Sequence, residues 1–148
     1  MTRGILDNFI LKDQNGKDFN LYENLDKKLL LVFYPKGSSP VCSIQLSNYQ
    51  KNKKTFEDYN IRVAGINTES GKSHASFCNS LGIDIPMLCD ETKEISRRFN
   101  ALNLFGRNKR KLVLIGVDKK ILFEKSSLPV FYFNTDKIID MLKEENLL

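Results

Sequence analysis

The fold is decided by a stretch that reads Leu29-Leu30-Leu31-Val32-Phe33-Tyr34-Pro35-Lys36-Gly37-Ser38-Ser39-Pro40-Val41-Cys42. Its opening run, residues 29–34, is apolar on both faces of an extended chain, which is typical of a buried parallel strand. The Gly, Ser and Pro residues that follow predict a loop. Apolar and aromatic residues then recur at helical spacing, which predicts a helix from about Val41 to Tyr59.

Strands and helices alternate through the rest of the chain. We expect strands over 61–67, 85–88, 111–117 and 121–125, helices over 70–81 and 135–146, a helical turn or two over 95–102, and an N-terminal hairpin that turns at Asn15-Gly16. This pattern predicts an α/β fold, with a mixed central sheet flanked by helices. Ligands of such sheets bind beyond the carboxyl ends of the strands, where the loop over 35–42 lies.

The length of 148 residues predicts one domain, residues 1–148.

The net charge is +5, and the densest basic cluster is Arg107, Lys109, Arg110 and Lys111. It has no interleaved aromatic residues, so we expect a solvated basic loop and no nucleic-acid partner. The longest apolar run is too short to cross a bilayer and the N-terminus has no apolar signal core, so we expect a cytoplasmic protein with no membrane partner.

The chain has three cysteines, Cys42, Cys78 and Cys89. An odd count argues against a disulfide framework. The chain has no CxxC motif and only one His, which argues against a zinc site. We therefore expect no metal or cofactor. Cys42 stands at the predicted start of a helix, where free N–H groups and the helix dipole favour a thiolate. Ser39 brings a hydroxyl to the same place. The alternatives are that Cys42 is a small buried apolar residue and Ser39 a helix cap.

The run from Phe33 to Cys42 resembles the active-site loop of peroxiredoxins, and most closely the bacterioferritin-comigratory, or Q-type, group. The spacing PxxxSxxC is that of the family loop. The similarity extends over nearly the whole chain, through the opening hairpin at 9–16, residues 73–77 and 86–90, and Arg110 before the strand that begins near Leu112. The resemblance implies a thioredoxin-like fold and a thiol-dependent peroxidase acting on hydrogen peroxide and organic hydroperoxides.

The resemblance also implies the site residues. Cys42 would attack the peroxide O–O bond and become a sulfenic acid. Arg110 would hold the thiolate and polarise the peroxide, Ser39 would hydrogen-bond the attacked oxygen, and Pro35 would shield the site from water. For Arg110 the alternative is a surface charge in a basic run.

The chain departs from the family pattern at several positions. Ser39 replaces the commoner Thr, Val41 stands where Gly is usual, and Ser47 stands where many members carry the resolving Cys. Cys78 on the helix over 70–81 resembles the resolving Cys of a second subset, which implies an intramolecular Cys42–Cys78 disulfide. Its place in an apolar stripe leaves core packing as the alternative. Cys89 ends a predicted buried strand and is interpreted as a residue that only packs in the core. A role as a substitute for the resolving cysteine is left open.

The resemblance implies thioredoxin or a similar dithiol as the reductant, and a monomer. The main rival is a non-enzymatic thioredoxin-fold module that relays oxidation or binds a partner, because fold alone does not dictate function.

Overall fold

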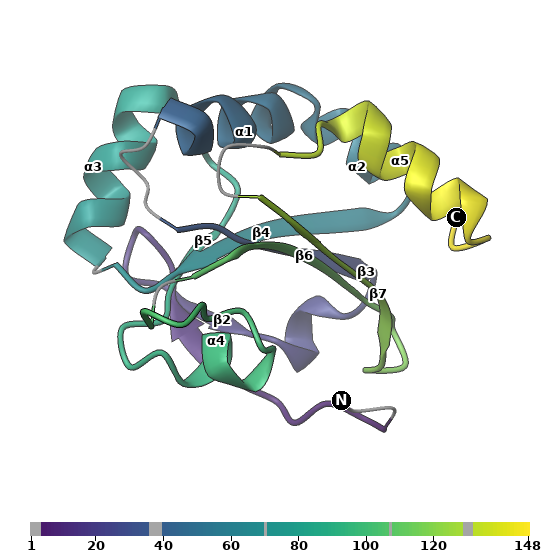
Figure 1. Cartoon of the computed structure of the whole chain (residues 1–148), viewed down its shortest axis with the longest axis horizontal. Helices are drawn as coiled ribbons and strands as arrows, with labels where there is room; N and C mark the ends of the chain where they lie inside the picture. The colour runs from purple at the N-terminus through teal and green to yellow at the C-terminus, as the bar shows by residue number, and fades with distance from the viewer. Residues whose placement is uncertain (1–3, 36–39, 70, 107, 129–131) are drawn as a thin grey trace.

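The computed structural model describes residues 4–35, 40–69, 71–106, 108–128 and 132–148, and the side chains of these residues except at 40, 71–74 and 77. Its centre is a sheet in the order β5-β4-β3-β6-β7 (Figure 1). The strands are β3 (Lys28–Phe33), β4 (Ile61–Asn67), β5 (Met87–Cys89), β6 (Arg110–Ile115) and β7 (Ile121–Ser127). β3, β4 and β5 pair in parallel, whereas β6 is antiparallel to β3 and to β7. The predicted mixed sheet and parallel β3–β4 pair are confirmed.

Four helices lie on one side of the sheet and the remaining short elements lie on the other (Figure 1). The first set is α1 (Pro40–Lys51), α2 (Lys53–Asp58), α3 (Gly71–Leu81) and α5 (Thr135–Glu144), and the second is β1 (Ile10–Lys12), β2 (Asp18–Asn20), η1 (Tyr22–Asn24) and α4 (Glu94–Arg98). Alternate side chains of β3 enter two separate cores: Leu30, Val32 and Tyr34 face the four helices, and Leu29, Leu31 and Phe33 face the other layer. This explains why the run is apolar at every position.

The N-terminal hairpin is confirmed, and it docks against the sheet. Gly16 has a φ of +77°, which a residue without a Cβ adopts at little cost. The Gln14 side chain, which is buried, donates to the Ile85 carbonyl (3.1 Å) and accepts from the Met87 N–H (2.8 Å). The hairpin turn therefore lies beside β5.

The helix predicted from Val41 to Tyr59 is divided into α1 and α2 at Asn52. The Asn52 side-chain amide donates to the Asn48 carbonyl (2.8 Å), and the backbone N–H of Asn52 bonds the same oxygen (3.1 Å). An Asn side chain that competes for a helical carbonyl disturbs the regular ladder, which accounts for the break.

The strand predicted over 85–88 begins later, at Met87. Pro86 has no N–H to give to a ladder, although its carbonyl accepts from the Gly65 N–H (2.9 Å). The strand therefore starts after the proline and extends to Cys89. Similarly, β6 begins at Arg110 itself rather than after it, and Gly116 and Val117 belong to the turn of the β6–β7 hairpin.

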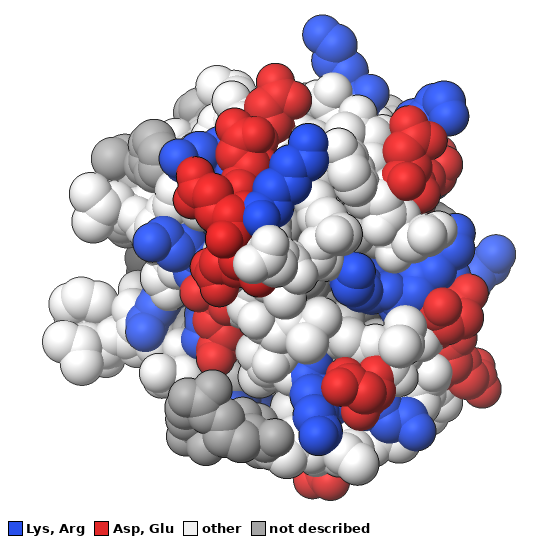
Figure 2. Space-filling model, turned by 90° about the vertical axis from the view of Figure 1, so that its right-hand side faces the viewer, with Lys and Arg blue, Asp and Glu red and all other residues white. Residues whose placement is uncertain are grey.

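Within the described part of the chain, no helix is long and apolar enough to cross a membrane. Basic and acidic side chains lie next to one another on the face drawn in Figure 2.

Candidate active site around Cys42

Cys42 lies in the first turn of α1, directly beyond the carboxyl end of β3. Its side chain is fully buried, in the same core as Tyr34 and Leu46. The apolar run ends at Tyr34 and the helix begins at Pro40, which places Cys42 in the first helical turn. A thiol in the first helical turn lies near backbone N–H groups that have no partner inside the helix, and these favour its negative form.

Arg110 meets Cys42 on the helical face of the sheet, at the start of β6. Because β6 is antiparallel to β3, the first residue of β6 lies at the end where β3 finishes, and the pairing of Lys111 with Phe33 sets that register. Lys111 faces the layer that contains α4, so Arg110 faces the helices. Its Nη1 donates to Cys42 Sγ at 3.3 Å, and its side chain is buried with 3% exposure. A fixed guanidinium at this distance stabilises a thiolate and any negative charge that develops beside it.

Gln45 orients Arg110. The same Nη1 that donates to Cys42 also donates to Gln45 Oε1, and the Gln45 side chain is buried. Gln45 Nε2 donates to the Tyr49 hydroxyl (3.1 Å), and that hydroxyl donates to the Phe133 carbonyl (2.6 Å). Since the single Tyr49 proton is given to Phe133, the hydroxyl must accept from Gln45. The amide oxygen of Gln45 is thereby turned toward Arg110.

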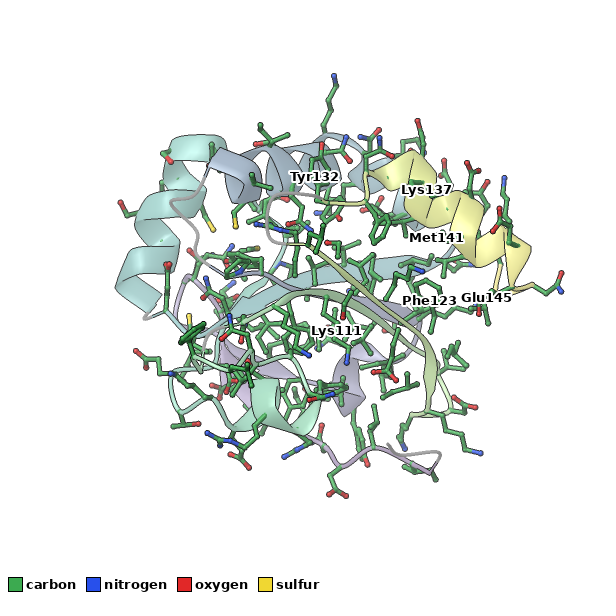
Figure 3. The ribbon with its side chains drawn as sticks, viewed as in Figure 1. Lys111, Phe123, Tyr132, Lys137, Met141 and Glu145 are labelled. Atoms are coloured by element: carbon green, nitrogen blue, oxygen red, sulfur yellow. The ribbon has the colours of Figure 1, made fainter. Side chains whose placement is uncertain are left out.

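Tyr49 is suited to remain neutral in this network. Burial raises the pKa of its phenol, while the hydrogen bond from Gln45 opposes the rise. The Tyr132 ring packs edge-on against Tyr49, with centroids 6.5 Å apart, and Figure 3 shows Tyr132 beside α1 on the helical side of the sheet. The proton of Tyr49 therefore stays available to hold the Phe133 carbonyl.

The helical spacing places Gln45 and Tyr49 on one face of the helix predicted from Val41 to Tyr59, and it assigns neither residue a role. The signal that could have identified Gln45 is an amide side chain on a buried helical face, one turn from a candidate nucleophile. Its partner Arg110 lies 65 positions away in the sequence, so its contact could not be derived from spacing.

The remaining predicted site residues are distributed as follows. Pro35 is half-buried and follows Tyr34 at the end of β3. Ser39 lies outside the described residues. Cys78 is buried in α3, in the same core as Cys42 and Tyr34, and all three cysteines are free thiols.

Burial raises the pKa of the Cys78 thiol to about 11, and the negative charge of Asp13 adds to this rise. Cys78 is therefore held as a thiol in this conformation. The two thiols thus have different charged neighbours, Arg110 beside Cys42 and Asp13 near Cys78, although both thiols lie in one core.

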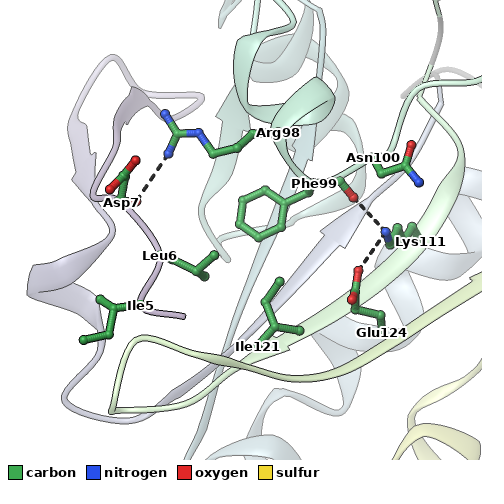
Figure 4. Close-up of a pocket in the computed structure, with 9 residues that line it drawn as sticks. All are labelled: Ile5, Leu6, Asp7, Arg98, Phe99, Asn100, Lys111, Ile121 and Glu124. Carbon is green, nitrogen blue, oxygen red and sulfur yellow. Dashed lines mark hydrogen bonds and ion pairs between the residues drawn. The ribbon is translucent and has the colours of Figure 1, made fainter. Parts of the chain in front are cut away.

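A cavity of about 630 Å³ lies on the other face of the sheet (Figure 4). There Lys111 Nζ donates to the Phe99 carbonyl (2.7 Å) and pairs with Glu124 (2.9 Å). Figure 3 shows Lys111 on the side of the sheet opposite Tyr132. Since Lys111 and Arg110 are neighbours on one strand and point to opposite faces, this cavity is separate from Cys42.

Among the described residues, no group of three or more His, Cys, Asp or Glu side chains is arranged to hold a metal ion. The polar group in contact with Cys42 is instead a donor, the Arg110 guanidinium, which suits an anionic sulfur or oxygen.

A model of the AhpC/TSA family matches residues 5–123. The chain belongs to the AhpC/TSA family. This is a family of thiol-dependent peroxidases, and the predicted resemblance to its bacterioferritin-comigratory, or Q-type, peroxiredoxins is confirmed. The peroxiredoxin bcp of one Helicobacter pylori strain is 31% identical over 102 residues, which cover 67% of each chain. The chloroplastic peroxiredoxin Q of Gentiana triflora is 29% identical over 136 residues, which cover 89% of this chain and 60% of the relative.

Solved structures of AhpC/TSA proteins share the fold. The peroxidoxin BcpB of Mycobacterium tuberculosis superposes with a TM-score of 0.83 at 26% identity, covering 97% of this chain and 94% of the other. A mutant of Xylella fastidiosa PrxQ superposes with a TM-score of 0.84 at 23% identity, covering 99% of both chains. The predicted thioredoxin-like fold with an N-terminal hairpin is therefore confirmed.

Proposed function

We propose that this member of the AhpC/TSA family reduces hydrogen peroxide and organic hydroperoxides with Cys42 as the nucleophile. The observation that carries the proposal is the 3.3 Å contact between Arg110 Nη1 and Cys42 Sγ at the start of α1. The thiolate attacks one oxygen of the O–O bond and becomes a sulfenic acid, and the other oxygen leaves with the bonding electrons and takes a proton to form water or an alcohol.

Arg110 serves this step in two ways. It favours the thiolate before the attack, and its fixed positive charge lowers the energy of the departing oxygen, on which negative charge develops. Gln45 and Tyr49 keep the guanidinium in place. We assign Ser39 to hydrogen-bonding the peroxide oxygen and Pro35 to excluding water, as the family resemblance implies.

Cys78 is the proposed resolving residue. Its thiolate attacks the sulfenic sulfur of Cys42, a disulfide forms, and hydroxide leaves as water once it is protonated. Thioredoxin or a similar dithiol then reduces the disulfide by exchange. A disulfide requires Cα atoms roughly 4.4–6.8 Å apart. Cys42 belongs to the first turn of α1 and Cys78 to the middle of α3, so part of α3 is expected to unravel for the bond to form.

We also propose that residues 1–148 act as one domain and as a monomer. The site draws on α1, α3 and β6, and α5 packs on the same core as these elements. Neither the attack on peroxide nor the formation of the disulfide requires a second copy of this chain.

The test is peroxide consumption by the purified protein with a thioredoxin system. Cys42→Ser should abolish turnover, while Cys78→Ser should consume a first equivalent of hydrogen peroxide and then stall as a sulfenic or sulfinic acid. Full turnover in Cys42→Ser would contradict the assignment of the nucleophile. A folded wild type that consumes no peroxide with any dithiol would favour the non-enzymatic relay instead.

A further inference from the structure

Cys89 has no role in the proposed cycle, yet it lies at the same end of the sheet as Cys42. The parallel strands β3, β4 and β5 end together at Phe33, Asn67 and Cys89. The carboxyl ends of these strands form the edge of the sheet at which α1 begins and at which Arg110, the first residue of β6, lies. Cys89 is thus placed at the reaction end of the sheet by strand pairing.

The Cys89 side chain faces α3. Met87 belongs to the core beneath the helices and Leu88 to the core on the opposite face, so strand alternation directs Cys89 to the side of α3. Cys78 enters this same layer from α3 and contacts the core that contains Met87. The two thiols therefore belong to the same layer, Cys89 on β5 and Cys78 on α3.

Electrostatic coupling agrees with this arrangement. Burial raises the pKa of Cys89 to about 11, and Glu91, Asp13 and then Cys78 add to the rise. The pKa of the buried Tyr34 is raised by its burial and then by Cys78, Glu69, Cys42 and Cys89. All three thiols are thus near enough to Tyr34 to influence its pKa.

Cys89 lines a cavity. It shares a hollow of about 460 Å³ with Ala75 of α3, with the hairpin residues Lys12, Asp13, Gln14 and Gly16, and with Glu91. Cys89 is 8% exposed, whereas Cys42 is fully buried. A disulfide that includes Cys89 would border this hollow, which a reductant can approach.

Resting on the proposed function, we infer that Cys89 is a third redox residue that receives the disulfide from Cys42. After the Cys42–Cys78 bond has formed, the Cys89 thiolate attacks Cys78 Sγ. The Cys78–Cys89 bond forms, the Cys42–Cys78 bond breaks, and Cys42 leaves as a thiolate with the bonding electrons. The proton lost by Cys89 goes to solvent, and no external oxidant or reductant is consumed.

The direction of this exchange follows from the leaving groups. The thiolate that leaves most easily is the one best stabilised, and Arg110 stabilises Cys42 from 3.3 Å. The charged group that adds to the raised pKa of Cys78 is instead the negative Asp13. Attack at Cys78 that releases Cys42 is therefore favoured over attack at Cys42 that releases Cys78. The exchange frees Cys42 for a new peroxide and moves the disulfide to the cavity.

The full-length protein can test this with one equivalent of hydrogen peroxide, no reductant, rapid alkylation and non-reducing tryptic mapping. Trypsin cuts after Lys36, Lys51, Lys72 and Lys93, so Cys78 and Cys89 share the peptide 73–93, whereas Cys42 lies in the peptide 37–51. A Cys78–Cys89 bond leaves a single peptide that is lighter by two hydrogens, together with alkylated Cys42. A Cys42–Cys78 bond joins the two peptides.

We expect wild type to yield the internally bonded peptide 73–93, and Cys89→Ser to stop at the joined peptides. Wild type should also consume about two equivalents of peroxide without reductant, against about one for Cys89→Ser, because Cys42 is released. Cys89→Ala, with circular dichroism, separates loss of the thiol from misfolding. Joined peptides in both proteins would overturn the relay and leave the proposed function intact. Persistent sulfenic acid in Cys89→Ser would instead show that Cys78 does not resolve Cys42, and both proposals would fail.

Discussion

Arg110 Nη1 and Cys42 Sγ lie 3.3 Å apart although 68 positions separate them in the sequence. Both side chains are buried, and the guanidinium also donates to Gln45. The Arg110 side chain is therefore held in one position, unlike a charged side chain on the surface. A buried charge that is paired with a nucleophilic sulfur marks a functional site more than a stabilising one.

Replacing Arg110 by Ala should slow the oxidation of Cys42 by roughly 100-fold or more, the usual effect of removing a donor that stabilises developing oxyanion charge. Lys should restore only part of the rate, because an ammonium cannot serve Cys42 and Gln45 with one planar group. Stopped-flow oxidation of the reduced protein by hydrogen peroxide measures this step alone. Equal rates in wild type and Arg110→Ala would show that the guanidinium takes no part in the attack.

Replacing Gln45 by Leu should slow oxidation by acting through Arg110. The guanidinium would lose a buried acceptor, which costs about 1–3 kcal/mol, and would lose its fixed direction. Tyr49→Phe is the milder companion, because it leaves the Gln45–Arg110 bond in place while removing the hydroxyl that orients the amide.

A double-mutant cycle distinguishes positioning from general destabilisation. In an Arg110→Ala background, Gln45→Leu should have little further effect on the oxidation rate, because the group that it positions is gone. Urea unfolding gives the stability change separately. Additive losses in rate would indicate that Gln45 acts independently of Arg110.

Strengthening α3 should slow disulfide formation without slowing the first oxidation. Ser76 and Asn79 are exposed on this helix and have low helix propensity. Replacing both by Ala should stabilise α3 by about 1 kcal/mol and slow its opening about fivefold. Asp140→Ala on the exposed face of α5 serves as the matched control. A resolution rate unchanged by the double substitution would mean that α3 need not unravel.

The resolution step should accelerate as pH rises from 7 to 9, whereas the first oxidation should not follow the same profile. Burial raises the pKa of Cys78 to about 11, so the thiolate that attacks the sulfenic acid is scarce at neutral pH and becomes more abundant as pH increases toward that value. The two rates are separable by following sulfenic acid after a pulse of peroxide. A resolution rate independent of pH would contradict attack by a deprotonated Cys78.

The sequence by itself determined the architecture and the place of the nucleophile. An apolar run at 29–34, a loop of Gly, Ser and Pro and a helical pattern define one strand, one turn and one helix start, and each of these depends on residues close together in the chain. The sequence pattern did not predict the helix break at Asn52, because the break depends on a single hydrogen bond from the Asn52 side chain to the Asn48 carbonyl.

Only the tertiary structure decided what surrounds Cys42. The antiparallel register of β6 on β3 brings Arg110 to the thiol, and the Gln45–Tyr49–Phe133 hydrogen bonds fix its direction. The alternation of β5 likewise turns Cys89 toward α3. Apart from the Gln45–Tyr49 bond within α1, these contacts join residues tens of positions apart. The strand register and the facing of each side chain are set when strands pair and cores pack, and local sequence preference does not determine them.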